Sequence, residues 1–417
     1  MTSDNLTSAT LPKRPAVATR PPAGGLSRGL SCGLTAVLAL TSAVTVGNIY
    51  FPQAVVPLAA AGLHVAPTTA ATAVTATQVG YTAGIATISP LADRLPQRRL
   101  LIVLLMLNGL ALLAAGAAPT VLLLVLASAL VGVTCVAAQV TGLVAAGLVA
   151  ADRQGAAIGI LLSGSTAGML LARAFSGVLG EHLGWRVPYL VAVAVVLLLA
   201  IVARFTVPVT APSSRQPYRA LLAESLRLLR TEAGLRHSCV NQAAVFGAFS
   251  AIWTCVGLLL TGPSYRLGAG AVGALALVGA ATVGCTPVVG RLVDRRGPDA
   301  VNLVCMLAVL AAAALMAEGA RGGPIGLAAL ILGVLLLDVA MQSGMTANKA
   351  RVYALRPDAR GRLNTAFMTC AYAGGSLGSW AGVHAWSQAG WPGVCALTAL
   401  LTLLALATHR LAVRRGR

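Results

Sequence analysis

The sequence is poor in charged and aromatic residues. Of its 417 residues, 10% are charged and 4% are aromatic, whereas 57% are hydrophobic. The mean hydropathy is +0.84. So few charges cannot cover the water-exposed surface of a soluble chain this long, and the composition therefore predicts an all-α integral membrane protein.

The chain has only two lysines, and their positions argue against ATP as the energy source. Neither Lys13 nor Lys349 follows a glycine, so the chain lacks the Gly-x-x-x-x-Gly-Lys-Ser/Thr loop that cradles nucleotide phosphates. No two of the eight cysteines are spaced as Cys-x-x-Cys, and no grouping of histidines and carboxylates marks a metal or hydrolytic site. We therefore predict no metal, no cofactor and no enzymatic centre, with the proton gradient as the energy source.

Twelve apolar segments, each long enough to cross a bilayer, follow one another along the chain. Their approximate limits are 31 to 57, 68 to 90, 100 to 117, 121 to 145, 156 to 180, 187 to 206, 238 to 260, 270 to 290, 300 to 318, 325 to 348, 363 to 387 and 392 to 409. These segments predict a multi-pass membrane protein.

The distribution of basic residues predicts the orientation. With both termini in the cytoplasm, Arg186, Arg266 and Arg321 fall in outer loops and Arg173 falls within a span, while the other 26 of the 30 Lys and Arg lie on the cytoplasmic side. This bias is the positive-inside rule, and it predicts residence in the inner (plasma) membrane. The net charge of +19 is then explained by contact with anionic lipid headgroups, and nucleic-acid binding is not predicted.

The chain also contains an internal repeat. The segment 290–297 has a counterpart 201 residues upstream at 89–96, and the Gly-Trp pair at 184–185 recurs 206 residues later at 390–391. Parallel halves in an apolar chain are a transporter architecture. The expected parts are a disordered cytoplasmic tail (1–30), a six-helix bundle (31–206), a cytoplasmic linker (207–237), a second six-helix bundle (238–409) and a basic cytoplasmic tail (410–417).

The linker contains leucines at helical spacing with arginines between them. Leu221, Leu222, Leu226 and Leu229 would share one face of a helix over 220–230. This pattern predicts an amphipathic helix lying on the inner leaflet.

The two repeated loops carry a family signature. The second copy keeps Gly290, Leu292, Asp294, Arg295 and Gly297 of the pattern Gly-x-Leu-x-Asp-Arg-x-Gly, and the first copy keeps Leu91, Asp93, Arg94 and Arg98. With its two sets of six spans, the chain over 31–409 resembles the major facilitator superfamily (MFS) of secondary transporters, and most closely its bacterial efflux branch. The resemblance implies two six-helix bundles that work by alternating access, with these loops as gates. The chain departs from the antiporter pattern at Ser128, where an arginine is usual.

Two ionisable residues lie inside predicted spans. Asp338 is the only acid there, and its short side chain cannot reach water from about 15 Å below the membrane surface. Arg173 is the only cation there, about seven residues from the outer end of its span, where its longer side chain could extend to the interface. We interpret both as proton-coupling candidates, with a structural hydrogen bond for Asp338 and an extended arginine for Arg173 as alternatives.

A second group of candidates is polar or aromatic. Asn241, Phe249 and Trp253 form a stripe at helical spacing with Gln242 beside it, which is typical of a cavity wall, although an interfacial tryptophan is equally consistent with Trp253. The remaining cavity-lining candidates are Asn48, Tyr50, Gln53, Gln139 and Gln342.

Together these features predict a monomeric transporter whose partners are a small-molecule substrate and lipid. The first expectation is proton-coupled efflux of a small organic solute as an antiporter, and the alternative is a proton-coupled importer of a small metabolite. A subunit of an ATP-driven permease and a membrane enzyme are weaker alternatives, because the doubled Asp-Arg loop favours a secondary transporter.

The topology can be tested by labelling introduced cysteines with a membrane-impermeant maleimide. Arg215→Cys, in the linker, should react in inverted vesicles and stay protected in intact cells, because the basic segments remain inside. Ser264→Cys, in a predicted outer loop, is the matched control and should show the opposite behaviour. Labelling of position 215 from outside would overturn the orientation.

Overall fold

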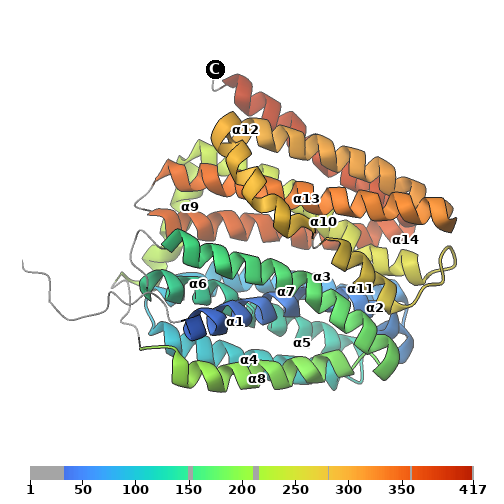
Figure 1. Cartoon of the computed structure of the whole chain (residues 1–417), viewed down its shortest axis with the longest axis horizontal. Coiled ribbons are helices and arrows are strands. Elements are labelled where there is room, and N and C mark those ends of the chain that lie inside the picture. The colour runs from blue at the N-terminus through green and yellow to red at the C-terminus, as the bar shows by residue number, and fades with distance from the viewer. Residues whose placement is uncertain (1–31, 149–153, 210–215, 280, 357–358, 416–417) are drawn as a thin grey trace, which may run out of the picture.

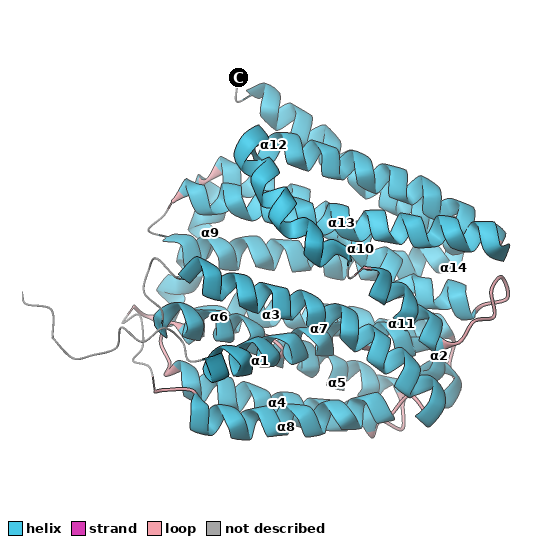
Figure 2. Cartoon of the chain, viewed as in Figure 1, coloured by secondary structure: helices cyan, strands magenta, loops and turns pink. Residues whose placement is uncertain are grey.

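The computed structural model is entirely helical in the part of the chain that it describes, residues 32–148, 154–209, 216–279, 281–356 and 359–415. Helices joined by short loops make up these segments, with no strand among them (Figure 2). Among the described residues, eight stretches are long and apolar enough to cross a membrane. The predicted all-helical, multi-pass class is therefore confirmed.

The helices form two halves that lie side by side, and most of the helix axes run in a similar direction (Figure 1). The first half contains α1 (Cys32–Tyr50), α2 (Pro52–Gly62), α3 (Pro67–Ala92), α4 (Gln97–Gly116), α5 (Val121–Thr134), α6 (Ala137–Leu148), α7 (Gln154–Leu183) and α8 (Val187–Thr206). After α9 (Tyr218–Thr231), the second half contains α10 (Ala233–Thr261), α11 (Ala269–Val278), α12 (Ala281–Glu318), a short 3₁₀ helix (Gly319–Arg321), α13 (Gly323–Leu355) and α14 (Arg360–Arg415).

The helices do not correspond one to one with the twelve predicted spans. The first span breaks between α1 and α2, because Pro52 has no N–H for a helical hydrogen bond. The fourth span breaks between α5 and α6. In the second half, α12 joins two spans through a bend at Gly297 (φ 79°), and α14 joins two through a bend at Gly390 (φ 61°). The sequence places a loop at 290–297, which is wrong, since that segment is helical up to the bend.

The linker contains the predicted amphipathic helix, α9, but a different face is buried. Leu221 and Leu228 are buried, whereas Leu226 is 60% exposed. The helix contacts both halves: the Tyr218 hydroxyl donates to the Thr87 carbonyl of α3 at 2.8 Å, and Glu224 forms an ion pair with Arg362 of α14. We call this end of the molecule the linker end and the opposite one the far end.

Polar contacts between the halves are found at mid-depth and toward the far end. The hydroxyls of Thr75 in α3 and Ser379 in α14 are 2.8 Å apart, and Glu181 of α7 accepts a hydrogen bond from the Gly270 amide of α11 at 2.6 Å. Apolar side chains such as Leu110 of α4 (64% exposed) face outward, as a lipid-facing surface requires. The junction between the halves therefore contains buried polar side chains, and the candidate site lies there.

Candidate functional site at the junction of the two halves

The break between α1 and α2 shapes the first-half side of the site. Tyr50 ends α1 and Gln53 lies at the start of α2, and both are buried. The Ser176 hydroxyl of α7 donates to the Phe51 carbonyl at 3.0 Å, which fixes α7 against the break. The break at Pro52 thus lets Gln53 face α7. On α7, Ser176 lies about one helical turn from Arg173.

Arg173 lies at the centre of the site with no exposed surface. Its Nε donates to Gln53 Oε1 at 2.8 Å, and its guanidinium carbon is 3.9 Å from the ring centroid of Trp253 and 4.9 Å from that of Tyr50. The Phe249 ring is slightly farther, at 5.7 Å. Aromatic faces attract a cation, and the effect is larger when water is excluded. The alternative in which Arg173 extends to the membrane surface is therefore wrong, because these rings hold it inside.

Asp338 lies on the second-half side of the same junction and is 2% exposed. Helix α13 begins 15 residues before it and ends 17 residues after it, so the acid is near the middle of the helix. The Trp253 indole N–H donates to its Oδ1 at 2.9 Å. Trp253 is itself fully buried, so its alternative role as an interfacial anchor is wrong.

Trp253 connects the two charges. Its ring stacks on Arg173 of the first half, and its N–H binds Asp338 of the second half. The sequence left a contact between these two residues open, and the structure joins them through the indole. Several buried atoms at this junction have no hydrogen-bond partner within the described residues, namely Arg173 Nη1 and Nη2, Gln53 Nε2 and Asp338 Oδ2. Buried polar atoms normally have partners, so unpaired ones indicate a place for a ligand or a proton.

Two tyrosines in this region escaped the sequence analysis. The ring of Tyr372 packs edge-on against that of Tyr81, with centroids 4.6 Å apart, and the hydroxyls of Tyr50 and Tyr372 are 3.3 Å apart across the halves. The predicted candidate Gln139 donates to the Tyr81 hydroxyl at 3.2 Å. Their positions in the sequence could have identified them as candidates, because tyrosine usually lies near the ends of membrane spans and these two lie well inside.

Three other predicted cavity residues, Asn48, Asn241 and Gln242, have hydrogen-bond partners away from Arg173 and Asp338. Asn48 donates to Asn108 Oδ1 at 3.0 Å within the first half. In the second half, Asn241 contacts His409 and Gln242 Oε1 accepts from Asn348 at 3.2 Å, both toward the linker end. Gln342 is half-buried, one turn along α13 from Asp338. The structure thus brings together Tyr50, Gln53, Arg173, Phe249, Trp253 and Asp338.

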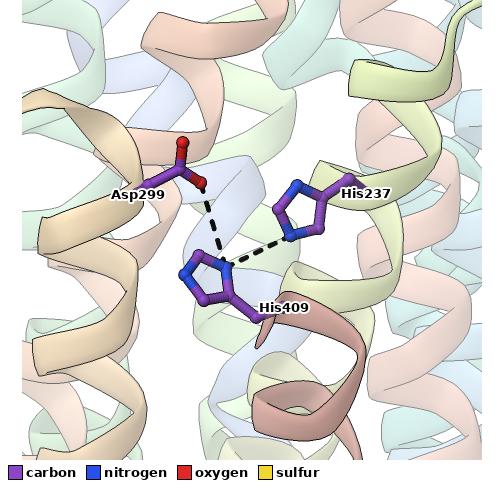
Figure 3. A group of neighbouring side chains, drawn as sticks. All are labelled: His237, Asp299 and His409. Carbon is purple, nitrogen blue, oxygen red and sulfur yellow. Dashed lines mark hydrogen bonds and ion pairs between the residues drawn. The ribbon is translucent and has the colours of Figure 1, made fainter. Parts of the chain in front are cut away.

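A separate cluster at the linker end contains His237, Asp299 and His409 (Figure 3). His237 Nε2 is 3.1 Å from His409 Nδ1, which is 4.0 Å from Asp299 Oδ1. Arg351 of α13 pairs with Asp299 and donates to His237 Nδ1 at 2.7 Å. The sequence analysis found no cluster of histidines with carboxylates, and it missed this one because three helices distant along the chain meet here.

The hydrogen bonding of this cluster does not fit a metal ion. A guanidinium can only donate, so His237 Nδ1 must accept from Arg351, and the neutral ring carries its hydrogen on Nε2. That hydrogen points to His409 Nδ1, whereas a metal would need the lone pairs of both nitrogens. The cluster is therefore a hydrogen-bonded tie among α10, α12, α13 and α14.

The two repeated loops differ in their surroundings. Asp93, at the end of α3, is half-buried; burial raises the pKa of its carboxyl, and the nearby Arg362 of the second half opposes this shift. Asp294 and Arg295 on α12 are exposed, as is Arg94. In the first copy, Arg98 donates to the Arg204 carbonyl. An electrostatic interaction between the halves is therefore found at the first copy, between Asp93 and Arg362, although the second copy keeps the signature better. Of the two signature glycines in the second copy, Gly297 forms the bend in α12 and Gly290 lies within its helical part.

Two helical halves that cross a membrane and enclose a buried charged site define a polytopic membrane transporter. The chain belongs to the Major Facilitator Superfamily, whose family model matches residues 38–379. It is 30% identical over 378 residues to YgaY of Escherichia coli (strain K12), named as a transporter, covering 90% of this chain and 95% of that protein. It is 31% identical over 399 residues to SCO4007 of Streptomyces coelicolor (strain ATCC BAA-471 / A3(2) / M145), also named as a transporter, covering 95% and 92%.

Solved structures support the same fold. A single-residue mutant of the nucleoside transporter NupG superposes with a TM-score of 0.74 at 12% identity, over 92% of this chain and all of that one. A bacterial homolog of the human lysosomal transporter Spinster, in an inward-facing and occupied conformation, superposes with a TM-score of 0.70 at 14% identity, over 93% and 98%. At these identities the likeness shows the fold alone.

Trp253→Phe tests the role of the indole N–H. An aromatic ring beside Arg173 is kept, but Asp338 loses its donor, which should cost about 1–3 kcal/mol of stability and should change transport. Trp391→Phe is the matched control, because this buried indole donates to the Met316 carbonyl at 2.7 Å, far from the charges. Thermal unfolding in detergent should shift similarly in both variants, whereas vesicle transport should fall only in Trp253→Phe. Equal transport in the two variants would contradict a role for the bond to Asp338.

Proposed function

We propose that the protein is a proton-coupled secondary active transporter of a small organic solute. It works in the plasma membrane with both termini in the cytoplasm, as the distribution of its basic residues favours. The linker end is then the cytoplasmic end. The proton gradient supplies the energy, no cofactor takes part, and the protein acts as a monomer that needs only its solute and lipid.

The observation that carries this proposal is the charged unit at the junction. Arg173 belongs to one half, Asp338 to the other, and Trp253 contacts both. When two halves rock against each other around a central site, such contacts must loosen and form again. The charge state of the unit therefore influences which arrangement of the halves is favoured.

Asp338 is the proton carrier in this proposal. With the carboxyl ionised, it balances the guanidinium of Arg173; with the carboxyl protonated, the site carries one unbalanced positive charge. Charges in a water-excluded site interact much more strongly than charges in water, so one proton changes the energetics of the whole junction. Its unpaired Oδ2 is available to take the proton.

The linker end supplies the gate. Arg362 pairs with Glu224 of α9 and lies near Asp93 of α3, so it joins the second half to both the linker and the first half. We propose that these contacts hold the cytoplasmic side closed and separate when it opens.

The direction of transport depends on whether proton and solute exclude each other or bind together. Export in exchange for protons, the first expectation from the sequence, requires that they compete. Import with protons, the alternative, requires that they bind in the same step. The unpaired donors of Arg173 and Gln53 favour the second, because a proton on Asp338 leaves Arg173 without its counter-charge.

Asp338→Asn tests the coupling in reconstituted vesicles. The solute is first identified, from a panel of small organic compounds, by the change in internal pH that it causes. The variant is locked in the neutral state, so exchange of labelled solute between equal concentrations should persist while accumulation driven by a pH gradient is lost. Asp299→Asn, at the linker end, is the control and should retain both activities.

Two results would count against this assignment. If Asp338→Asn still accumulates solute against its gradient, the proton is carried elsewhere. If exchange, accumulation and folding are lost together, Asp338 has only a structural role.

A further inference from the structure

We propose that Arg173 and Gln53 bind a carboxylate group of the transported solute. The proposal rests on the transporter function given above and specifies its substrate class as organic monocarboxylates. Within the described residues, three donor atoms of this pair are buried without an acceptor: Arg173 Nη1, Arg173 Nη2 and Gln53 Nε2. Both side chains are almost completely buried, at 0% and 1% exposed.

The orientation of Gln53 follows from Arg173. The guanidinium Nε can only donate a hydrogen bond, so the Gln53 atom 2.8 Å from it must be the amide oxygen. The amide nitrogen of Gln53 is therefore the other atom of the group, and it is a donor. Donors thus outnumber acceptors around Arg173, and an incoming ligand must supply oxygen atoms.

The aromatic rings around Arg173 do not remove this need. A stacked ring attracts the positive charge, but the N–H groups of a guanidinium lie in its plane and remain free to donate at their outer edge. Trp253, at 3.9 Å, and Tyr50, at 4.9 Å, therefore position the guanidinium and leave its Nη atoms available.

Charge and shape favour a carboxylate over other ligands. The site has one cation, so with Asp338 protonated a single negative charge balances it, whereas a phosphate dianion would leave an excess. A carboxylate also matches the planar fork of a guanidinium with two parallel hydrogen bonds. An amine would be repelled by Arg173.

The proposal fixes the sign of the coupling. Ionised Asp338 competes with the ligand for the positive field of Arg173, and protonation removes this competition. Proton and carboxylate therefore favour each other's binding, since such linkage is reciprocal. The solute and the proton cross together.

The test is thermal unfolding of the purified full-length protein in detergent with four probes at equal ionic strength: benzoate, benzamide, benzylamine and inorganic phosphate. Benzoate should raise the melting temperature, because a ligand that binds only the folded state stabilises it. Its effect should be larger at about pH 6 than at about pH 8 in the wild type and independent of pH in Asp338→Asn. Benzamide and benzylamine should have little effect, and phosphate should have little effect at about pH 8, where it is mainly a dianion.

The variants identify the binding residues. Arg173→Gln should weaken benzoate binding by about tenfold to a hundredfold, which corresponds to a lost charged hydrogen bond, and Gln53→Leu should weaken it less. Arg321→Gln, at an exposed arginine near the far end, should bind like the wild type. If Arg173→Gln does not fold, the probe selectivity of the wild type and the Gln53→Leu variant decide the question.

Stabilisation by benzylamine, by phosphate in place of benzoate, by all four probes equally, or by none of them would overturn the carboxylate site. Unchanged benzoate binding in Arg173→Gln would do the same. These results are distinct from failure of the proton coupling. Uphill transport by Asp338→Asn would overturn the assignment of the proton to Asp338 but not the carboxylate site. Loss of benzoate selectivity would overturn the carboxylate site but not the proton coupling.

Discussion

Burial of a guanidinium between two helical halves is the constraint on which the rest of this structure depends. A charge removed from water is costly unless it is paired and hydrogen-bonded. The chain meets that cost at Arg173 with one amide oxygen, three aromatic faces and a carboxylate reached through Trp253. These groups come from both halves, so the stability of the junction depends on the charge of the site.

Within each half, polar networks hold the helices together. In the first half Asn108 donates to Thr134 at 2.8 Å, and in the second Asn302 and Asn348 exchange amide hydrogen bonds at 3.0 and 3.1 Å. The tie of His237 and His409 adds to the second network near the linker end. In an apolar interior such bonds keep a bundle rigid, so relative motion is expected at the junction, where several donors and acceptors remain unpaired.

The sequence predicted the helical class, the family and the presence of one acid and one cation within membrane spans, because each leaves a local signal in an apolar chain. It failed where geometry depends on distant partners. Rings from α1 and α10 keep the Arg173 side chain inside the protein. The spacing of residues along the sequence does not predict which distant rings will surround it. The sequence analysis did not recognise that 290–296 is helical, because a glycine can mark either a bend within a helix or a loop between helices. Tyr372 was missed because its partner, Tyr50, lies 322 residues away.

The most direct test of this account is a double-mutant cycle on the two charges, with unfolding of Arg173→Gln, Asp338→Asn and the double variant measured in detergent. Each single change leaves one buried charge uncompensated and should cost about 3–5 kcal/mol. Removing both charges should cost less than the sum of the single changes by at least about 1 kcal/mol, because the two residues act through Trp253 as one unit. Strictly additive losses would show that Arg173 and Asp338 are independent and would contradict the account.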